Sequence, residues 1–208
     1  MLIVHHLNNS RSQRILWLLE ELGVPYEIRQ HARDAVTNLA PPSLLDVHPL
    51  GKSPLIEDDG RVIAESGAIV EYICERHGGA ALVPARDSDS WAEHLELMHF
   101  AEGSVMLPVL LHLYVGRLGE AGAPLHPRVE SQLDLVFDHM ERVLRPSGHY
   151  VLDTLSAVDI MLSFPAEVAI AQGRAATRPK LAAFVEMIQA RPAYRRAIDK
   201  GGAYQFAR

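Results

Sequence analysis

The sequence predicts two domains, an α/β domain of order βαβ–ββα at residues 1–80 and an all-helical bundle domain at residues 89–208, joined by a linker at residues 81–88. A strand pattern, a helix pattern and a second strand pattern follow one another within about thirty residues, which is the length of a βαβ unit. Further along, an Asp-Gly pair separates two short apolar runs, as in a β-hairpin. Beyond the linker, the long apolar patterns have helical spacing.

The βαβ unit begins with a nearly continuous apolar run at residues 2–7, which is typical of a strand covered on both faces. A helix follows, because apolar residues recur at the spacing of one helix face at Ile15, Leu18, Leu19 and Leu22. Gly23 is expected just beyond its last turn, where glycine is common. Residues 26–29 then form a second strand, parallel to the first.

The ββα half follows a stretch without clear periodicity, residues 31–50, in which consecutive prolines favour a short helix or a loop. Residues 54–57 and 61–64 form the hairpin around its Asp-Gly turn. A helix is then expected from Ser66, whose hydroxyl can cap it, to a Gly-Gly pair that ends it.

The helical domain starts with one long segment, residues 91–118, that an internal glycine and an internal proline kink or divide into two helices. Residues 129–144 keep helical spacing for four turns, so one face of that helix is buried. Ser156 and Asp159 match the S-x-x-D capping box in front of an apolar run. The last predicted helix covers residues 181–188 and ends at an Arg-Pro pair.

Composition excludes several classes of function. The 208 residues carry 20 Lys and Arg against 26 Asp and Glu, with no basic block, so we expect no nucleic-acid partner. Cys74 is the single cysteine, so an internal disulfide is excluded and a reducing, cytoplasmic location is expected. We find no signal-peptide pattern and no 18-residue apolar run, and therefore expect neither export nor a membrane span.

Familiar catalytic and metal motifs are missing from the sequence. Residues 51–53 resemble the end of a phosphate-binding loop, but Asp46 stands where its first glycine belongs and Pro54 prevents the following helix. The patterns G-x-G-x-x-G, H-E-x-x-H, C-x-x-C and G-x-S-x-G do not occur. His5 and His6 are neighbours on a strand and point to opposite faces, so we expect no metal site from the histidines.

Ser10 lies where the first strand turns into a helix, whose first N–H groups lack partners and carry partial positive charge. Its hydroxyl either caps the helix, with Gln13 completing an S-x-x-Q capping box, or donates to a thiolate held there. Lowering a thiol pKa by two units requires about 2.7 kcal/mol. A hydrogen bond to a charge contributes about 1.5–3 kcal/mol and the helix end about 0.3–1 kcal/mol, which is sufficient. Because Cys74 lies elsewhere, that thiol comes from a ligand.

Two further positions suit a peptide-like ligand. Pro54 opens a strand and, in the cis form, would expose the backbone of Ser53 to an extended peptide, although most X-Pro bonds are trans. Glu65 and Ser66 place a carboxylate and a hydroxyl at the start of another helix, which suits a ligand with one ammonium and one carboxylate. The alternative for this pair is a plain helix cap.

These features in this order resemble the glutathione S-transferases over essentially the whole chain. Residues 48–54, His-Pro-Leu-Gly-Lys-Ser-Pro, are similar to the family segment N-P-x-G-K-V-P, with histidine for the usual asparagine and serine for the usual valine. Residues 65–69 are similar to its E-S-x-A-I segment, and Ser10 stands four residues before an arginine as the family's catalytic serine does. Residues 8–23 and 99–104 look most like the bacterial and fungal serine-type branch.

The resemblance implies a thioredoxin-like first domain that binds glutathione as co-substrate, with no metal. It further implies that Pro54 is cis, that Ser53 holds the cysteinyl backbone, and that Lys52 helps to bind the glycyl end. Glu65 and Ser66 would bind the γ-glutamyl end. The catalytic residues would be Ser10 and Asn9, whose side-chain amide can also donate to sulfur. The family's detoxification role, homodimer and cytoplasmic location are likewise implied.

The function expected from this resemblance is conjugation of the glutathione thiol to a hydrophobic electrophile. The helical domain would supply the electrophile pocket, although apolar stripes at helical spacing are more often core. The candidates are Phe100, Met106, Leu107, Leu111, Tyr114 and Phe164. Two alternatives remain open at this point: a glutathione-dependent disulfide reductase or peroxidase, and a non-catalytic glutathione-binding regulatory protein.

Overall fold

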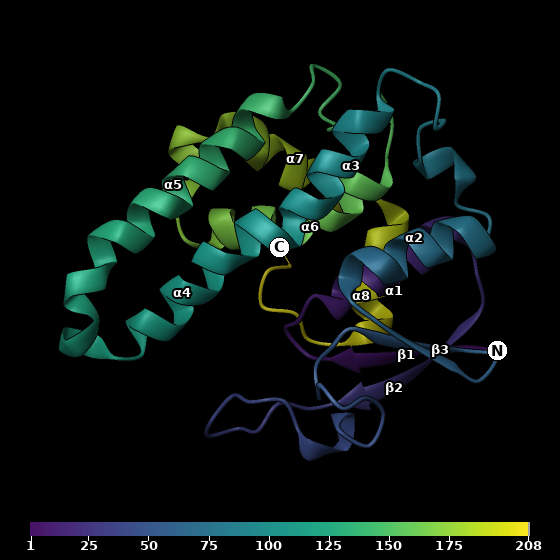
Figure 1. Cartoon of the computed structure of the whole chain (residues 1–208), viewed down its shortest axis with the longest axis horizontal. Coiled ribbons are helices and arrows are strands. Elements are labelled where there is room, and N and C mark those ends of the chain that lie inside the picture. The colour runs from purple at the N-terminus through teal and green to yellow at the C-terminus, as the bar shows by residue number, and fades with distance from the viewer. Residues whose placement is uncertain (208) are drawn as a thin grey trace. The chain divides into compact units, whose positions relative to one another are not determined.

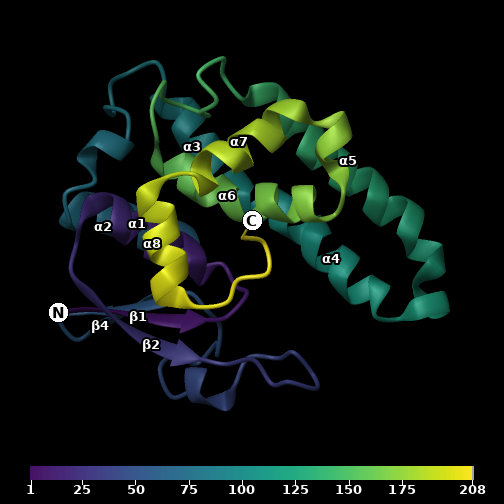
Figure 2. The same cartoon turned by 180° about the vertical axis from the view of Figure 1, so that it is seen from behind.

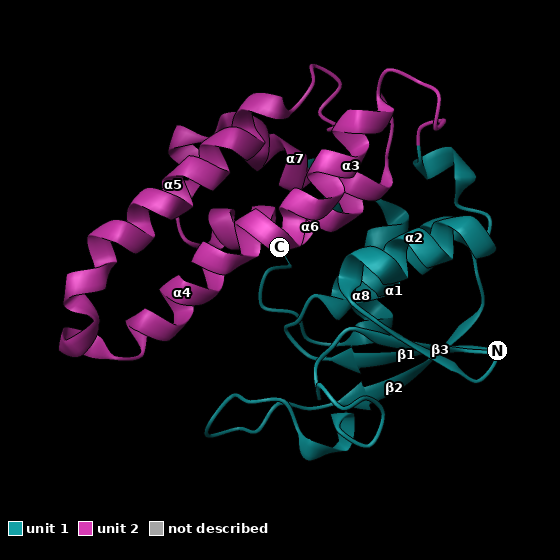
Figure 3. Cartoon of the chain, viewed as in Figure 1, with its two compact units in different colours: residues 1–83, 187–208 teal, residues 84–186 magenta. Residues whose placement is uncertain are grey.

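The structure, a computed structural model, describes residues 1–207 and divides the chain into two compact units (Figure 3). Residues 1–83 and the C-terminal residues from Met187 onward form the first unit, and residues 84–186 form the second. The elements of the first unit are β1 (Leu2–Leu7), α1 (Ser12–Leu22), β2 (Tyr26–His31), β3 (Leu55–Asp58), β4 (Arg61–Ala64), α2 (Ser66–Arg76) and α8 (Pro192–Gly201). The second unit contains α3 (Trp91–Phe100), α4 (Met106–Gly116), α5 (His126–Val143), α6 (Ala157–Ala171) and most of α7 (Pro179–Gln189).

The sheet of the first unit has the strand order β2-β1-β3-β4, with β1 parallel to β2 and antiparallel to β3. Every residue of β1 is buried, because it is a central strand and the helices of this unit cover one side of the sheet (Figure 1). At the β3–β4 turn, Asp59 and Gly60 have φ of 48° and 78°, as a two-residue hairpin turn requires. The predicted α/β class and βαβ–ββα order are therefore confirmed.

The helix ends of the first unit follow the sequence prediction only in part. Gly23 ends α1 with φ 65°, and its N–H donates to the carbonyl of Leu19, as predicted. The predicted Ser66 cap is wrong, because Ser66 is the first residue of α2. The preceding position belongs to Glu65, whose carbonyl accepts the N–H of Ile69 and whose φ is 72°.

Helix α8 is an element that the sequence analysis missed. The Arg-Pro pair ends the preceding helix as predicted, because α7 stops at Gln189. The same pair also begins a new helix, because the fixed φ and missing N–H of Pro192 suit a first helical position. The helix packs along α1 (Figures 1 and 2). Arg191 pairs with Glu21 at 2.6 Å, and Arg196 pairs with Glu20 at 2.9 Å. This grouping differs from the predicted division, which placed all of residues 89–208 in the helical domain.

The long helical segment of the second unit stays helical through its internal glycine and its internal proline. Helices α3 and α4 are joined by a π-helical stretch, Ala101–Val105, that keeps the run Trp91–Gly116 helical. This run is long and apolar enough to cross a membrane by length and composition, which corrects the expectation that no such run exists. Core helices of water-soluble proteins pass the same test, and 39% of its most apolar window is buried.

The start of α6 is fixed by the capping box that the sequence predicted. Ser156 is the N-cap residue, and its hydroxyl accepts the N–H of Asp159. The Asp159 carboxylate is fully buried and accepts the backbone N–H and the hydroxyl of Ser156, each at 2.6 Å. Its other oxygen accepts the N–H of Tyr150 at 3.1 Å. One side chain therefore joins the start of α6 to the preceding loop.

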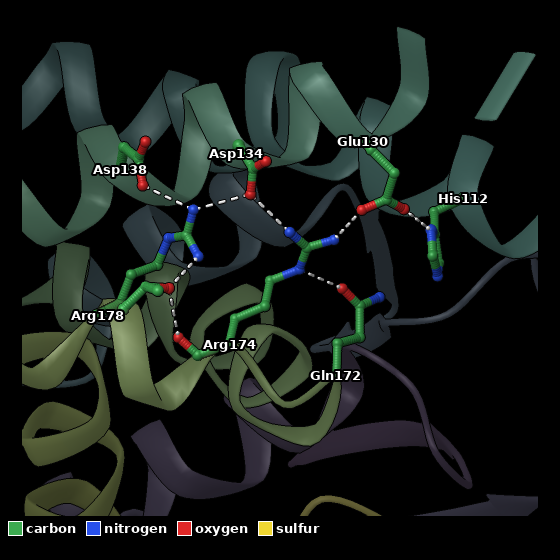
Figure 4. A network of polar contacts seen from close by, with 8 residues as sticks. His112, Glu130, Asp134, Asp138, Gln172, Arg174 and Arg178 are labelled. Carbon is green, nitrogen blue, oxygen red and sulfur yellow. Dashed lines mark hydrogen bonds and ion pairs between the residues drawn. The ribbon is translucent and has the colours of Figure 1, made fainter. Parts of the chain in front are cut away.

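A network of arginines and carboxylates connects α5 with the segment after α6 (Figure 4). Arg174 donates to Glu130 at 2.5 Å and to Asp134 at 2.7 Å. Arg178 donates to Asp134 at 2.9 Å and pairs with Asp138 at 2.7 Å. The Arg178 side chain is only 6% exposed, whereas both of its aspartate partners are half exposed.

Replacing Arg178 by methionine is expected to lower the free energy of unfolding by about 1–2 kcal/mol. The variant removes charge-assisted hydrogen bonds from a buried donor, but the aspartates keep access to water and Asp134 keeps Arg174. Urea denaturation measures the loss, and Arg128→Met on an exposed position of α5 is the matched control. Equal stabilities of the two variants would contradict this role of Arg178.

Candidate active site

An open pocket in the first unit collects the ligand-binding residues that the sequence predicted for that domain. Its empty volume is about 350 Å³. The residues that line it are Arg11, His48, Leu50, Lys52, Ser53, Pro54, Leu55, Ala64, Glu65 and Ser66. The loop before β3 and the start of α2 therefore bring together all five predicted positions, Lys52, Ser53, Pro54, Glu65 and Ser66.

The loop before β3 has the backbone that the resemblance implied. The peptide bond between Ser53 and Pro54 is cis. The Ser53 hydroxyl, at the position where the family usually has valine, donates to the carbonyl of His5 at 3.1 Å and so ties the loop to β1. Gly51 has φ 55°, and a Cβ there would lie 2.7 Å from a methyl carbon of Leu45, so the turn leading to the pocket requires glycine.

The start of α2 presents charge and hydrogen-bonding groups to the same pocket. Glu65 is exposed, and its side chain makes no capping hydrogen bond to the helix. Ser66 is buried in the first turn, where the helix N–H groups carry partial positive charge. A carboxylate beside such a helix end suits a ligand that carries an ammonium and a carboxylate on one carbon.

Five lining residues were not among the predicted site residues, and two of these five, Arg11 and His48, have side chains that can carry charge. Arg11 directly follows Ser10, and with Lys52 it adds positive charge to the pocket. His48 replaces the usual family asparagine, and its Nδ1 accepts the backbone N–H of Leu50 at 3.3 Å. The sequence contained a signal for both, because Arg11 adjoins the predicted catalytic serine and His48 begins the recognised segment.

Ser10 is 5% exposed and precedes the lining residue Arg11. Its Oγ accepts the N–H of Ser12 at 3.2 Å and lies 2.8 Å from the Oγ of Ser12. The alternative of a capping box with Gln13 is wrong, because α1 begins only at Ser12. Within residues 1–207, moreover, neither side-chain amide atom of Gln13 has a hydrogen-bond partner. The Ser10 hydroxyl bonds to the helix start without that box.

Asn9, the second predicted catalytic residue, holds C-terminal residues in place. Its Oδ1 accepts the N–H of Gln205 at 2.9 Å, and its carbonyl accepts a hydrogen bond from Arg33 at 3.4 Å. Its φ of 51° is in the left-handed region, which asparagine tolerates better than most residues. The amide nitrogen Nδ2 is thus the atom through which Asn9 could donate to sulfur.

The six predicted pocket residues of the helical domain fall into different environments. Met106 and Phe164 are buried, at 3% and 8% exposure. Phe100 is half-buried, with its ring edge against His139. The remaining candidates are exposed on α4, and these are Leu107, Leu111 and Tyr114. The electrophile pocket stays a prediction, and the exposed α4 residues are the members that solvent reaches most easily.

Cys74 is unsuited to be the nucleophile. The side chain is 3% exposed on α2, and burial, with a smaller contribution from Glu71, raises the pKa of its thiol to about 12. It therefore stays protonated at neutral pH, as expected of a small buried apolar residue. In the part of the chain that the structure describes, no group of three or more His, Cys, Asp or Glu side chains is placed to hold a metal ion.

Comparison with known proteins gives consistent matches. Residues 1–75 match the family model described as the glutathione S-transferase N-terminal domain. Glutathione S-transferase 3 of Schizosaccharomyces pombe is 32% identical, over 96% of this chain and 88% of that protein. Glutathione S-transferase 1 of Saccharomyces cerevisiae is 30% identical, over 96% and 95%. A crystal structure of a glutathione S-transferase from Actinobacillus pleuropneumoniae superposes with a TM-score of 0.90 at 30% identity, covering 100% of this chain and 96% of that one.

Proposed function

The chain belongs to the glutathione S-transferase family and is a glutathione transferase, and we propose that it binds glutathione in the pocket of the first unit and ionises the thiol beside Ser10. The observation that carries this proposal is the pocket itself. It joins the cis-proline loop to the start of α2, and the five glutathione-binding positions implied by the resemblance line it. Ser10 directly precedes the lining residue Arg11.

Glutathione fits this lining by the chemistry of its three parts. The γ-glutamyl end carries an ammonium and a carboxylate, which Glu65 and the helix start at Ser66 complement. The cysteinyl unit has peptide groups that pair with the backbone of Ser53. The glycyl carboxylate finds a cation in Lys52, and Arg11 adds a second positive charge.

The proposed mechanism begins with loss of the thiol proton to solvent and donation of a hydrogen bond from Ser10 to the resulting thiolate. That bond and the start of α1 stabilise the anion and lower the pKa of the bound thiol. The sulfur then forms a bond to the electrophilic carbon while the leaving group departs with its electron pair, or while the electrons of a double bond move onto the substrate. Cys74 takes no part, because its thiol stays protonated and buried.

The substrate class, the oligomeric state, the location and the cellular role are also proposals. We infer a hydrophobic electrophile, because Leu107, Leu111 and Tyr114 offer an exposed apolar surface on α4. A homodimer, a cytoplasmic location and a role in detoxification follow from family membership alone, and light scattering of the purified protein tests the first of them. The curated relatives reported above are named as transferases, so the reductase, peroxidase and regulatory alternatives are not favoured.

Calorimetry with reduced glutathione tests the proposed pocket. We expect Glu65→Gln to weaken binding about tenfold, because loss of one charge-assisted hydrogen bond costs about 1.4 kcal/mol or more. Glu27→Gln, at an exposed position of β2, is the matched control and should bind as the wild type does. Unchanged affinity of Glu65→Gln would remove Glu65 from the site, and no uptake by the wild type at millimolar glutathione would refute the proposed function.

A further inference from the structure

Behind Ser10 a chain of short hydrogen bonds runs into the interior of the first unit. Ser10 Oγ lies 2.8 Å from Ser12 Oγ, and Ser12 Oγ lies 2.8 Å from Nδ1 of His6. His6 on β1 is 3% exposed and Ser12 at the start of α1 is fully buried. A catalytic hydroxyl that donates a hydrogen bond needs its proton to point at the substrate. The direction in which these hydrogen bonds are donated therefore decides whether Ser10 can donate to a bound ligand.

The ring of His6 fixes the direction of the chain at its inner end. Burial, with a smaller contribution from His31 on β2, lowers the pKa of His6 to about 4 even though a hydrogen bond to Gly201 opposes the shift. His6 is therefore neutral near pH 7 and carries one ring proton. Its Nε2 faces Gly201 at the end of α8, where a Cβ would lie 3.3 Å from that nitrogen. A carbonyl can only accept, so the proton is on Nε2 and Nδ1 is an acceptor.

The acceptor at His6 determines where the hydroxyl protons of Ser12 and Ser10 point. Ser12 has one hydroxyl proton and two acceptors for it, Nδ1 of His6 at 2.8 Å and the carbonyl of Leu7 at 3.2 Å. The nearer acceptor is His6, and with either acceptor the proton points away from Ser10. Ser12 Oγ itself accepts the N–H of Leu7 at 3.2 Å, which leaves it a lone pair for Ser10. Ser10 Oγ already accepts the N–H of Ser12, so its own proton points to Ser12 Oγ. The hydroxyl of Ser10 thus points inward in the ligand-free protein.

We propose that His6 and Ser12 are positioning residues that hold the hydroxyl proton of Ser10 away from the ligand thiol, so that Ser12 and the bound thiolate compete for it. This inference rests on the proposed role of Ser10 as donor to the thiolate. The pair thereby sets the acidity of bound glutathione: the thiolate gains the Ser10 hydrogen bond only by displacing the one to Ser12.

The surroundings of His6 keep its proton on one nitrogen. Ser12 on α1 and Gly201 on α8 bond to the ring, and His31 on β2 is the titratable neighbour that acts on it electrostatically. Burial lowers the pKa of His31 as well. A Cβ at position 201 would lie 2.8 Å from a methyl carbon of the fully buried Leu16, so a larger residue there would displace that side chain or move the end of α8 away. Helix α8 therefore supplies the carbonyl that fixes the ring proton of His6 and with it the direction of the hydrogen bonds from Ser10 to His6.

The decisive measurement is the pKa of the thiol of bound glutathione, followed by the ultraviolet absorbance of the thiolate as pH is varied. Ser12→Ala removes the inward acceptor and frees the Ser10 hydroxyl for the ligand, so we expect the thiol pKa to fall by about 0.5–1 unit. His6→Phe removes the nearer acceptor for Ser12 and leaves only the carbonyl of Leu7 at 3.2 Å, so the thiol pKa should shift in the same direction by a smaller amount. Ser163→Ala, a buried serine of α6, is the matched control and should leave it unchanged.

A double-mutant cycle shows whether the effect passes through Ser10. In a Ser10→Ala background, Ser12→Ala should no longer change the thiol pKa. A shift that persists there, no shift in the Ser12 single variant, or a rise of the pKa in that variant would each overturn the inference. If Ser10→Ala itself leaves the thiol pKa unchanged, the role of Ser10 in the proposed function fails, and this inference fails with it.

A second, independent measurement uses the ligand-free wild-type protein, so it depends on no ligand and on no variant. Nitrogen-15 NMR of the histidine rings in the ligand-free wild type distinguishes the two neutral forms of His6. The proposal requires the proton on Nε2. A proton on Nδ1 would make His6 a donor to Ser12, and the Ser12 proton would then go to Ser10 or to the carbonyl of Leu7. His6 would not be the acceptor that the proposal requires, so this result would overturn the proposal whatever the protein catalyses.

Discussion

Replacing Ser10 by alanine is expected to lower kcat/KM for conjugation of glutathione to a small aryl halide by about 10- to 100-fold near neutral pH. The variant loses a hydrogen bond to a thiolate, which contributes about 1.5–3 kcal/mol, and each 1.4 kcal/mol is a factor of ten. Glutathione affinity should change little, because Glu65, Lys52 and the Ser53 backbone remain. Steady-state kinetics and calorimetry on the same samples separate the two effects.

The loss of kcat/KM in Ser10→Ala is expected to depend on pH. Without Ser10 the pKa of the bound thiol rises, so the deficit is greatest below the wild-type pKa and shrinks as pH rises through the pKa of the variant. Ser131→Ala, on an exposed position of α5, is the control and should behave as the wild type. If the Ser10→Ala variant has the wild-type kcat/KM at all pH values, Ser10 is not the donor to the thiolate. The next candidate to test is then Nδ2 of Asn9.

Asp159→Ala is expected to destabilise the protein more than any other single substitution considered above, by about 3–5 kcal/mol. The carboxylate is fully buried and accepts hydrogen bonds from Ser156 and Tyr150, so its removal leaves buried donors without an acceptor. It also removes half of the capping box of α6. Denaturation by urea, followed by circular dichroism, measures the loss.

The control for this substitution is Asp153→Ala, an exposed aspartate in the loop before α6, which should change stability by less than about 0.5 kcal/mol. Ser156→Ala should fall between the two, at about 1–2 kcal/mol, because it removes the N-cap hydroxyl but leaves the carboxylate its bond to Tyr150. If Asp159→Ala and Asp153→Ala unfold at the same urea concentration, the capping box does not contribute as described.

Local patterns predicted the first unit well, because its elements are defined by neighbouring residues. The apolar run of β1, the glycine after α1 and the Asp-Gly hairpin are all short-range signals, and each is confirmed. Helix α8 was missed because Pro192 favours both the end of one helix and the start of the next. The π-helical stretch between α3 and α4 has no distinctive residue pattern, so only packing reveals it.

In the candidate site, too, the residues of local motifs were predicted, whereas the contacts between distant segments were not. Lys52, Glu65 and their neighbours belong to motifs that can be read from the sequence, and the structure gathers them in one pocket. The bond between Ser12 and His6 joins a helix to a strand, and its direction depends on Gly201, near the other end of the chain. Periodicity also gave no means to tell buried Met106 from exposed Leu107.

The packing of α8 on α1 makes the first unit discontinuous, and this has a consequence for how the protein is made. During synthesis the sheet and α1 emerge from the ribosome before the second unit, whereas α8 emerges only after it. Until then Glu20 and Glu21 lack their arginine partners and the ring of His6 lacks the carbonyl of Gly201. The nascent amino-terminal module must therefore wait for the whole helical unit to be translated before its catalytic serine acquires its final hydrogen bonds.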